Sequence, residues 1–263
     1  MKTLLYIGFL LISMSSFAQF YKLSVDFHPS FLKKSKLIIN SNINGYSIFI
    51  NGDDFEESSN VPDSLCVVLE NFFEQYDFSH KGSIDTIGQE KIVENGDTII
   101  YYQLSMGTDG IDVYGELINK NRIRTFKFWS PDKLSKNHEL VQLLFEIMYN
   151  SYSNTKTIDY LEQLEQYFDF GLGLRKLNDD PLTYKLYGSI SANEVDELYA
   201  FFDSLPVDKK VYIDMSNFNG MGTMFDEDFL ELSETHRLVT WINCSENAKM
   251  TLKRAEIKGN RYK

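Results

Sequence analysis

Residues 209–232 constrain the fold of this chain more than any other stretch, because a short apolar strand there runs through a glycine-bearing turn into the start of a helix. The strand covers residues 211–214, the turn contains Gly222, and helical spacing of apolar residues covers 224–232. A strand that leads closely into a helix is the unit from which parallel sheets are built. The stretch therefore predicts an α/β arrangement in this part of the chain.

The same alternation continues on both sides of that stretch. Further strands are expected at residues 182–187 and 238–242. Ser191 and Glu194 have the spacing of a capping box that opens the helix after the first strand, and Ser245 is placed to cap a last helix. Three strands that alternate with three helices predict a mostly parallel sheet with right-handed crossovers over residues 182–263.

Two short runs in this region follow a known pattern. Residues 211–216 read Val-Tyr-Ile-Asp-Met-Ser, and residues 221–225 read Met-Gly-Thr-Met-Phe. Together with the strand, turn and helix over 184–202, they resemble the STAS family, the small α/β module of anti-sigma-factor antagonists and sulfate-transporter tails. The resemblance covers residues 182–257 and implies a STAS-like fold that binds other proteins.

The resemblance also points to three residues around one turn. In the family's signalling members a Ser or Thr at the helix start is phosphorylated, and the matching position is Thr223, preceded by Asp214 and Ser216. A phosphate there would meet the free N–H groups of a helix N-terminus. The alternative, which we favour, makes Thr223 an N-cap with Asp226 as its capping-box partner. Thr223, Asp214 and Ser216 are thus possible regulatory or interaction residues.

The preceding part of the chain, residues 19–152, shows the period-two alternation and Asn-Gly turns of antiparallel strands. The expected strands are 37–39, 46–50, 89–93, 98–104, 111–118 and 122–129, and the expected helices are 62–76 and 134–149. We expect an α+β domain in which the last four strands form an antiparallel meander and the final helix closes one sheet face. Residues 153–181 are expected to form a helical linker.

Aromatic residues mark the predicted meander. They are Tyr101, Tyr102, Tyr114, Phe126, Phe128 and Trp129. Alternation along a strand places rings on both faces of the sheet. One face should meet the helix at 134–149, and the other is either an exposed recognition surface or is buried between the domains. Trp129 is accordingly a fourth candidate interaction residue.

The first residues indicate export. Residues 1–18 combine a basic start at Lys2, a short apolar run and a small-x-small ending at Ala18, which is typical of a cleaved signal peptide with a mature chain that starts at Gln19. No later stretch is apolar enough to span a membrane. A formal net charge of −12 disfavours nucleic acid and anionic membrane surfaces as partners. We expect a periplasmic or extracellular protein.

Nothing in the sequence forms a recognisable catalytic, cofactor or metal motif. The four histidines, His28, His80, His138 and His236, lack metal-ligand spacing. Cys66 and Cys244 fall on apolar segments of different predicted domains, so two core thiols are expected in place of a disulfide. The sequence predicts no catalytic residues, no cofactor and no metal.

Three functional hypotheses follow. The first is a non-catalytic envelope protein that binds another protein or acts as a scaffold through a STAS-like domain. The second is a secreted inhibitor or immunity-type protein whose acidic surface captures a cationic effector. The third, a hydrolase that uses a pair of surface carboxylates, has no recognisable constellation of residues.

Overall fold

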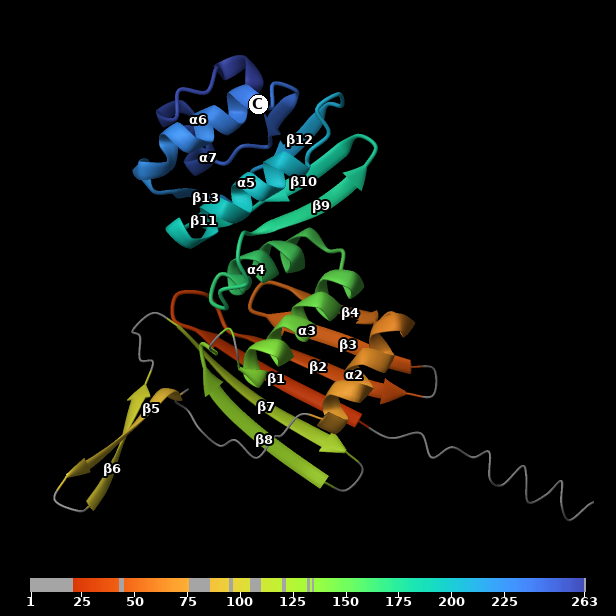
Figure 1. Ribbon diagram of the computed structural model, residues 1–263. Coiled ribbons are helices and arrows are strands. Elements are labelled where there is room, and N and C mark those ends of the chain that lie inside the picture. Colours follow the sequence, from red (N-terminus) through yellow and green to blue (C-terminus); the bar gives the residue numbers. More distant parts are fainter. Residues whose placement is uncertain are drawn as a thin grey trace, which may run out of the picture. The chain divides into compact units, whose positions relative to one another are not determined.

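The structure is a computed structural model that describes residues 21–42, 45–75, 86–94, 97–104, 110–119, 122–131, 133 and 135–262 (Figure 1). The chain divides into two compact units, Met1–Ile158 and Asp159–Lys263. The predicted signal peptide, residues 1–18, and the predicted mature start at Gln19 lie outside the described residues.

Unit 1 is built on a six-stranded antiparallel sheet with the strand order β4-β3-β2-β1-β7-β8. The strands are β1 (Tyr21–Pro29), β2 (Ser35–Asn42), β3 (Gly45–Gly52), β4 (Glu56–Asn60), β7 (Ile111–Asn119) and β8 (Arg122–Trp129). The central strand β1 alternates strictly between buried and half-buried residues. Because successive side chains point to opposite faces, this sheet has one covered face and one face that is not.

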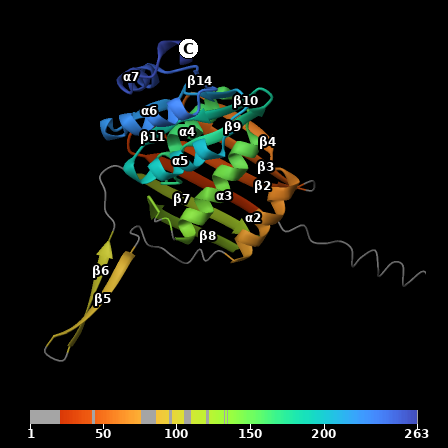
Figure 2. The same cartoon turned by 45° about the horizontal axis from the view of Figure 1, so that its top comes forward.

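Two helices cover the first face. α2 (Asp63–Gln75) and α3 (Lys136–Ser151) lie across the same side of the strands in both Figure 1 and Figure 2. α3 begins at Ser135, whose hydroxyl accepts a hydrogen bond from the His138 N–H at 3.1 Å. Eight of its residues are buried, so α3 is the main helical contribution to the core of unit 1 and fulfils the expected role of the 134–149 helix.

A glycine makes room for the aromatic part of this core. Gly115 of β7 is the register partner of Phe126 of β8, and a Cβ on Gly115 would come within 1.8 Å of the Phe126 ring. The ring therefore lies over the glycine. It stacks on Phe128 with a centroid distance of 5.8 Å and an interplanar angle of 10°.

The strand arrangement corrects one expectation. β5 (Thr86–Glu94) and β6 (Asp97–Leu104) pair as an antiparallel hairpin, as predicted, and so do β7 and β8. However, the expected meander of these four strands is wrong, because β5 and β6 form a separate two-stranded sheet and β7 pairs with β1. The sequence analysis did not identify β1 or β4, so the true neighbour of β7 was missing.

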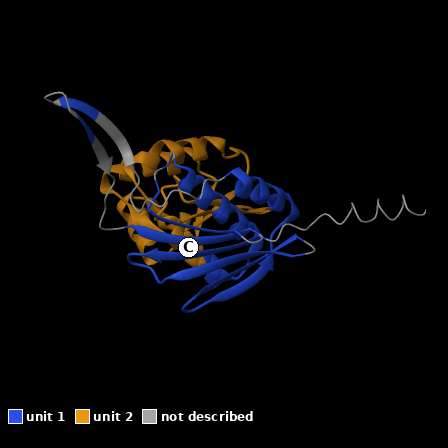
Figure 3. Ribbon diagram, turned by 90° about the horizontal axis from the view of Figure 1, so that it is seen from below, with its two compact units in different colours: residues 1–158 blue, residues 159–263 orange. Residues whose placement is uncertain are grey.

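Unit 2 (orange in Figure 3) has a mixed four-stranded sheet with the order β14-β12-β10-β9. The strands are β9 (Leu174–Asp179), β10 (Leu182–Leu186), β12 (Val211–Asp214) and β14 (Val239–Ile242). β10, β12 and β14 are parallel, as expected, whereas β9 is antiparallel to β10. A second, parallel pair consists of β11 (Gly188–Ile190) and β13 (Phe218–Met221), and neither strand was expected.

The helices of unit 2 connect these strands. They are α5 (Val195–Ser204), α6 (Asp226–Thr235) and α7 (Glu246–Arg254). A short 3-10 turn, η1 (Ala192–Glu194), precedes α5, and another, η2 (Thr223–Phe225), precedes α6. The predicted caps are present: the Ser191 N–H donates to Glu194 Oε2 at 2.6 Å, and the Ser245 hydroxyl accepts from the Ala248 N–H at 3.1 Å. Residues 153–181, expected to form a helical linker, contain α4 (Thr155–Glu165) and the edge strand β9.

A short segment covers the outer edge of β14. Tyr262 forms a parallel bridge with Trp241, the fully buried centre of the unit 2 core. The guanidinium of Arg261, in η3 (Gly259–Arg261), donates to the carbonyl oxygens of Ser233, His236 and Val239. These carbonyls belong to the end of α6 and the start of β14, so one side chain ties helix, strand and covering segment together.

Candidate functional site

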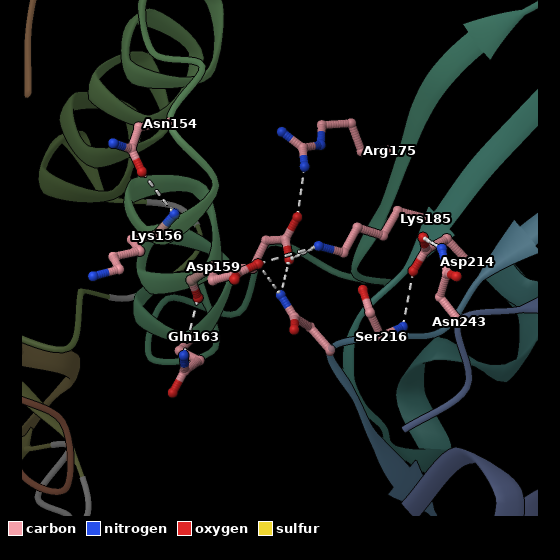
Figure 4. Close-up of polar contacts among 11 residues, drawn as sticks. Asn154, Lys156, Asp159, Gln163, Arg175, Lys185, Asp214, Ser216 and Asn243 are labelled. Atoms are coloured by element: carbon pink, nitrogen blue, oxygen red, sulfur yellow. Dashed lines mark hydrogen bonds and ion pairs between the residues drawn. The ribbon is translucent and has the colours of Figure 1, made fainter. Parts of the chain in front are cut away.

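The carboxyl ends of the parallel strands in unit 2 bring polar residues to one edge of the sheet (Figure 4). Lys185 of β10 is the register partner of Asp214 of β12, and Asn243 directly follows β14. In open α/β sheets this edge is where ligands usually bind.

Glu162 of α4 is the centre of a buried ionic network. Its side chain is 1% exposed, and it accepts from Lys185 Nζ at 2.8 Å through Oε2 and from Arg175 Nη2 at 2.5 Å through Oε1. Asn217 Nδ2 donates to Glu162 Oε2 at 2.6 Å and to Asp159 Oδ1 at 2.7 Å. Both carboxylate oxygens of Glu162 are thus engaged within unit 2.

The charges of this network balance, because two carboxylates, Asp159 and Glu162, face the two cations Lys185 and Arg175. Charge-assisted hydrogen bonds of this kind offset the cost of burying the carboxylate of Glu162. The network accounts for why a lysine and a glutamate are tolerated in the interior. It fixes α4 against β9 and β10, and it gives no free acid or base.

Asp214 is also engaged locally. Its Oδ1 accepts from the Ser216 N–H at 2.9 Å, and its Oδ2 accepts from Asn243 Nδ2 at 2.5 Å. Asp214 is buried, whereas Ser216 is exposed. The structure brings these two predicted residues together in a side-chain-to-backbone turn that orders the chain after β12.

Thr223 lies exposed at the start of η2. The expectation that it caps a helix with Asp226 as partner is wrong. Gly222 occupies the N-cap of η2, Phe225 occupies the N-cap of α6, and neither start has a side-chain cap. Arg254 Nε engages the Asp226 carboxylate at 2.7 and 2.9 Å, so this carboxylate is directed toward α7.

The uncovered side of the unit 1 sheet is the second candidate. We define the open face as the side opposite α2 and α3. On it lie Ser24, Asp26, Lys36, Tyr114, Glu116, Thr125, Lys127 and Trp129. A hollow with a volume of about 440 Å³ lies over β1, β2, β7 and β8 and is lined by the first seven of these residues together with Gly115 and Phe126.

Weak ion pairs and an aromatic contact organise the open face. Lys36 pairs with Asp26 at 3.4 Å, and Lys127 pairs with Asp112 at 3.6 Å and lies 4.8 Å from the centre of the Tyr114 ring. The pKa of Lys127 is raised, first by its hydrogen bond to Tyr114 and then by the charge of Asp112. These side chains are between about a third and a half exposed, so water screens the pairs and a partner can reach them.

Trp129 lies at one end of the open face, opposite Asp112 in the register of β7 and β8. Its ring lies over Gly110, where a Cβ would approach Trp129 to 2.2 Å. Trp129 is half-buried. Of the predicted aromatic set, Tyr114 and Trp129 share the open face, Phe126 and Phe128 are buried, and the side chains of Tyr101 and Tyr102 lie outside the described residues.

Several further properties bear on chemistry. Within the described residues, no group of three or more His, Cys, Asp and Glu side chains could hold a metal ion. In the same part of the chain, every helix is too short or too polar to cross a membrane. Cys66 and Cys244 are free thiols, and burial raises the pKa of Cys66, which makes it less reactive.

Comparisons of the chain with protein-family models, with curated proteins and with solved structures find no match.

Proposed function

We propose that this protein is an exported, non-catalytic protein of the cell envelope that binds another protein through the open face of unit 1. The observation that carries the proposal is the hollow over β1, β2, β7 and β8, with its half-exposed ion pairs and the rings of Tyr114 and Trp129 beside it. Exposed aromatic side chains beside polar groups that water still reaches are a frequent feature of protein-binding surfaces.

In this proposal unit 2 is a STAS-like scaffold domain. The resemblance over residues 182–257 and the alternation of parallel strands with α5, α6 and α7 support this assignment. The pairing of Glu162 with Lys185, and the hydrogen bonds of Asp214 with Ser216 and Asn243, support a structural role for the sheet edge. Export rests on the sequence of residues 1–18 and places the partner in the periplasm or outside the cell.

The test is affinity capture from envelope extract with the chain that starts at Gln19 as bait. Thr125 is exposed on β8 and lines the hollow, so Thr125→Arg would fill it without removing a contact of the core. We expect the wild type to retain one specific protein, and we expect Thr125→Arg to retain at least ten-fold less of that protein. The exposed Lys34→Glu variant, away from the hollow, is the matched control and should retain the protein fully.

Two results would contradict the proposal. One is the retention of no protein by the wild type. The other is equal retention by Thr125→Arg and Lys34→Glu, which would place the binding surface elsewhere.

A second candidate is an inhibitor or immunity-type protein that captures a cationic effector. It is favoured by the acidic surface of α5 and α6, which the Tyr199 hydroxyl joins by donating to Asp228 Oδ1 at 2.7 Å. The exposed acids on these helices are Asp196, Glu197, Asp203, Glu227, Glu231 and Glu234. Under this alternative, Glu227→Lys with Glu231→Lys abolishes capture, the bound protein is basic, and retention falls steeply with salt.

A further inference from the structure

The hairpin of β5 and β6 lacks a partner that such a small sheet needs. Among the described residues it pairs with no other strand. Two strands alone are marginally stable in water and gain stability from a third strand or from packing. The hairpin nevertheless exposes apolar side chains: Val93 is 69% exposed, Ile100 39% and Ile99 37%.

These apolar residues occupy both faces of the hairpin. The register pairs Val93 with Thr98, Ile92 with Ile99 and Lys91 with Ile100. Val93 and Ile100 therefore share one face, and Ile99 lies on the other. Apolar side chains on both faces are typical of strands inside a larger sheet.

The six-stranded sheet of unit 1 has a matching opening at β8. β8 is the last strand in the order, with no neighbour on its outer side in the described part of the chain. It has eight residues, and Ile123 on it is 64% exposed. The opposite edge, β4, has five polar residues, which is a common way to discourage strand addition.

The opposite charges of β8 and of the β5–β6 hairpin favour the hairpin as the partner of this edge. β8 contains Arg122, Arg124 and Lys127 and no acidic residue, although the whole chain has a formal net charge of −12. The sequences of β5 and β6 contain three acidic residues and one lysine. Two β8 strands would repel each other, whereas a hairpin of opposite charge is attracted.

We propose that two copies of this chain associate by strand addition, with β5 of each hairpin pairing antiparallel with β8 of the other copy. The register that sets Val93 opposite Ile123 makes cross-strand neighbours of two exposed apolar side chains. In the described part of one chain no strand pairs with either surface, and in the dimer each surface gains the other as its neighbour. In this reciprocal arrangement each copy gives its hairpin to the other copy and receives the other hairpin at its own β8 edge, so the assembly closes as a two-fold dimer.

Cysteine cross-linking tests the pairing and its register. Opposed residues on neighbouring strands have Cβ atoms about 4.5–5.5 Å apart, close enough for a disulfide after a small adjustment. We expect an equimolar mixture of Val93→Cys and Ile123→Cys chains to form a disulfide-linked dimer on mild oxidation. Each variant alone controls for bonds through the half-buried Cys66. A chain that carries both Val93→Cys and Ile123→Cys tests for pairing within one chain. The proposal is overturned if the mixture gives no cross-linked dimer, or if the only disulfide found is one within the doubly substituted chain.

Sedimentation equilibrium tests the association itself. The chain from Gln19 onward should have twice its monomer mass at about 100 μM, and Val93→Lys with Ile100→Lys, or Arg122→Glu alone, should weaken the dimer at least ten-fold, about 1.4 kcal/mol. The matched controls are Val207→Lys, at a site 83% exposed in unit 2, and Lys34→Glu. A monomer at this concentration, or a dimer that neither variant weakens, contradicts the proposal. Either result leaves the capture experiment on the open face unaffected.

Discussion

Unit 1 leaves the polar side chains of its sheet half-exposed on the open face, whereas unit 2 buries Lys185 and Asp214 at the carboxyl ends of its parallel strands. The Lys36–Asp26 pair is 45% and 37% exposed, while the Lys185–Glu162 pair is 9% and 1% exposed. The same residue types therefore have different consequences. In unit 2 they are buried and paired with one another, so they hold the fold, and in unit 1 water screens them, so they cost little to rearrange.

The largest expected effect comes from removing the centre of the buried network. Glu162→Ala leaves Lys185 and Arg175 without their carboxylate, and breaking a buried pair in this way costs about 3–5 kcal/mol. Each unit contains one of the two tryptophans, Trp129 and Trp241. In a Trp129→Phe background, fluorescence in urea reports on unit 2, and its midpoint should fall sharply.

Glu246→Ala is the control for this experiment, because Glu246 pairs with Lys249 on the surface of α7 in the same unit. It should change the midpoint only slightly, because exposed ion pairs contribute little to stability. An equally small change for Glu162→Ala would remove the contrast between buried and exposed pairs.

The next largest effect concerns the covered face of unit 1. Gly115→Ala places a Cβ within 1.8 Å of the Phe126 ring, and overpacking of this kind costs about 1–3 kcal/mol. In a Trp241→Phe background, Trp129 fluorescence should report the loss. Lys34→Ala, at an exposed position of the same unit, is the control and should leave the midpoint unchanged.

A smaller effect is expected from the open face itself. A double-mutant cycle of Asp26→Ala and Lys36→Ala, measured by urea unfolding, should give a coupling energy below about 1 kcal/mol because both groups are solvated. The same cycle for Glu162 and Lys185 should give several times more. Equal coupling energies in the two cycles would contradict our comparison of the two sheets.

The smallest expected effect is on the stability of unit 2 at alkaline pH, through the hydrogen bond that joins Tyr199 of α5 to Asp228 of α6. The hydrogen bond to Asp228 is the main cause that raises the pKa of Tyr199 to about 12, from 10.0. The folded state thus favours the protonated phenol, so this contribution to stability is complete below pH 10 and is lost as the pH rises toward 12. Tyr199→Phe should show a slightly shallower fall in midpoint over this interval than the wild type, and identical slopes would refute the assignment.

Local patterns in the sequence predicted many of the elements. The capping residues Ser191 and Ser245 and the strand that ends at Asp214 were predicted because each depends on neighbours within a few positions. β1 was missed although Tyr21, Leu23, Val25 and Phe27 alternate clearly. Its pairing with β7 joins residues about ninety positions apart and has no local signal.

The candidate sites were harder to predict than the fold. Trp129 was singled out, but the hollow beside it is made by four strands whose order the sequence does not specify. Glu162 and Lys185 were missed, although a lysine within the otherwise uncharged strand β10 signalled that a buried anion was needed. The predicted capping box of Thr223 and Asp226 does not form, because the Asp226 carboxylate pairs with Arg254, which lies 28 positions away in the sequence.

The segment that covers β14 makes the protein vulnerable to trimming by proteases. Lys258 is exposed, and cleavage there would release Arg261 from three carbonyl oxygens and Tyr262 from its bridge with Trp241. The end of α6 would lose its cation, and β14 would become an unpaired edge next to the largest side chain of the core. The loss of these few residues would thus expose a strand edge and favour aggregation.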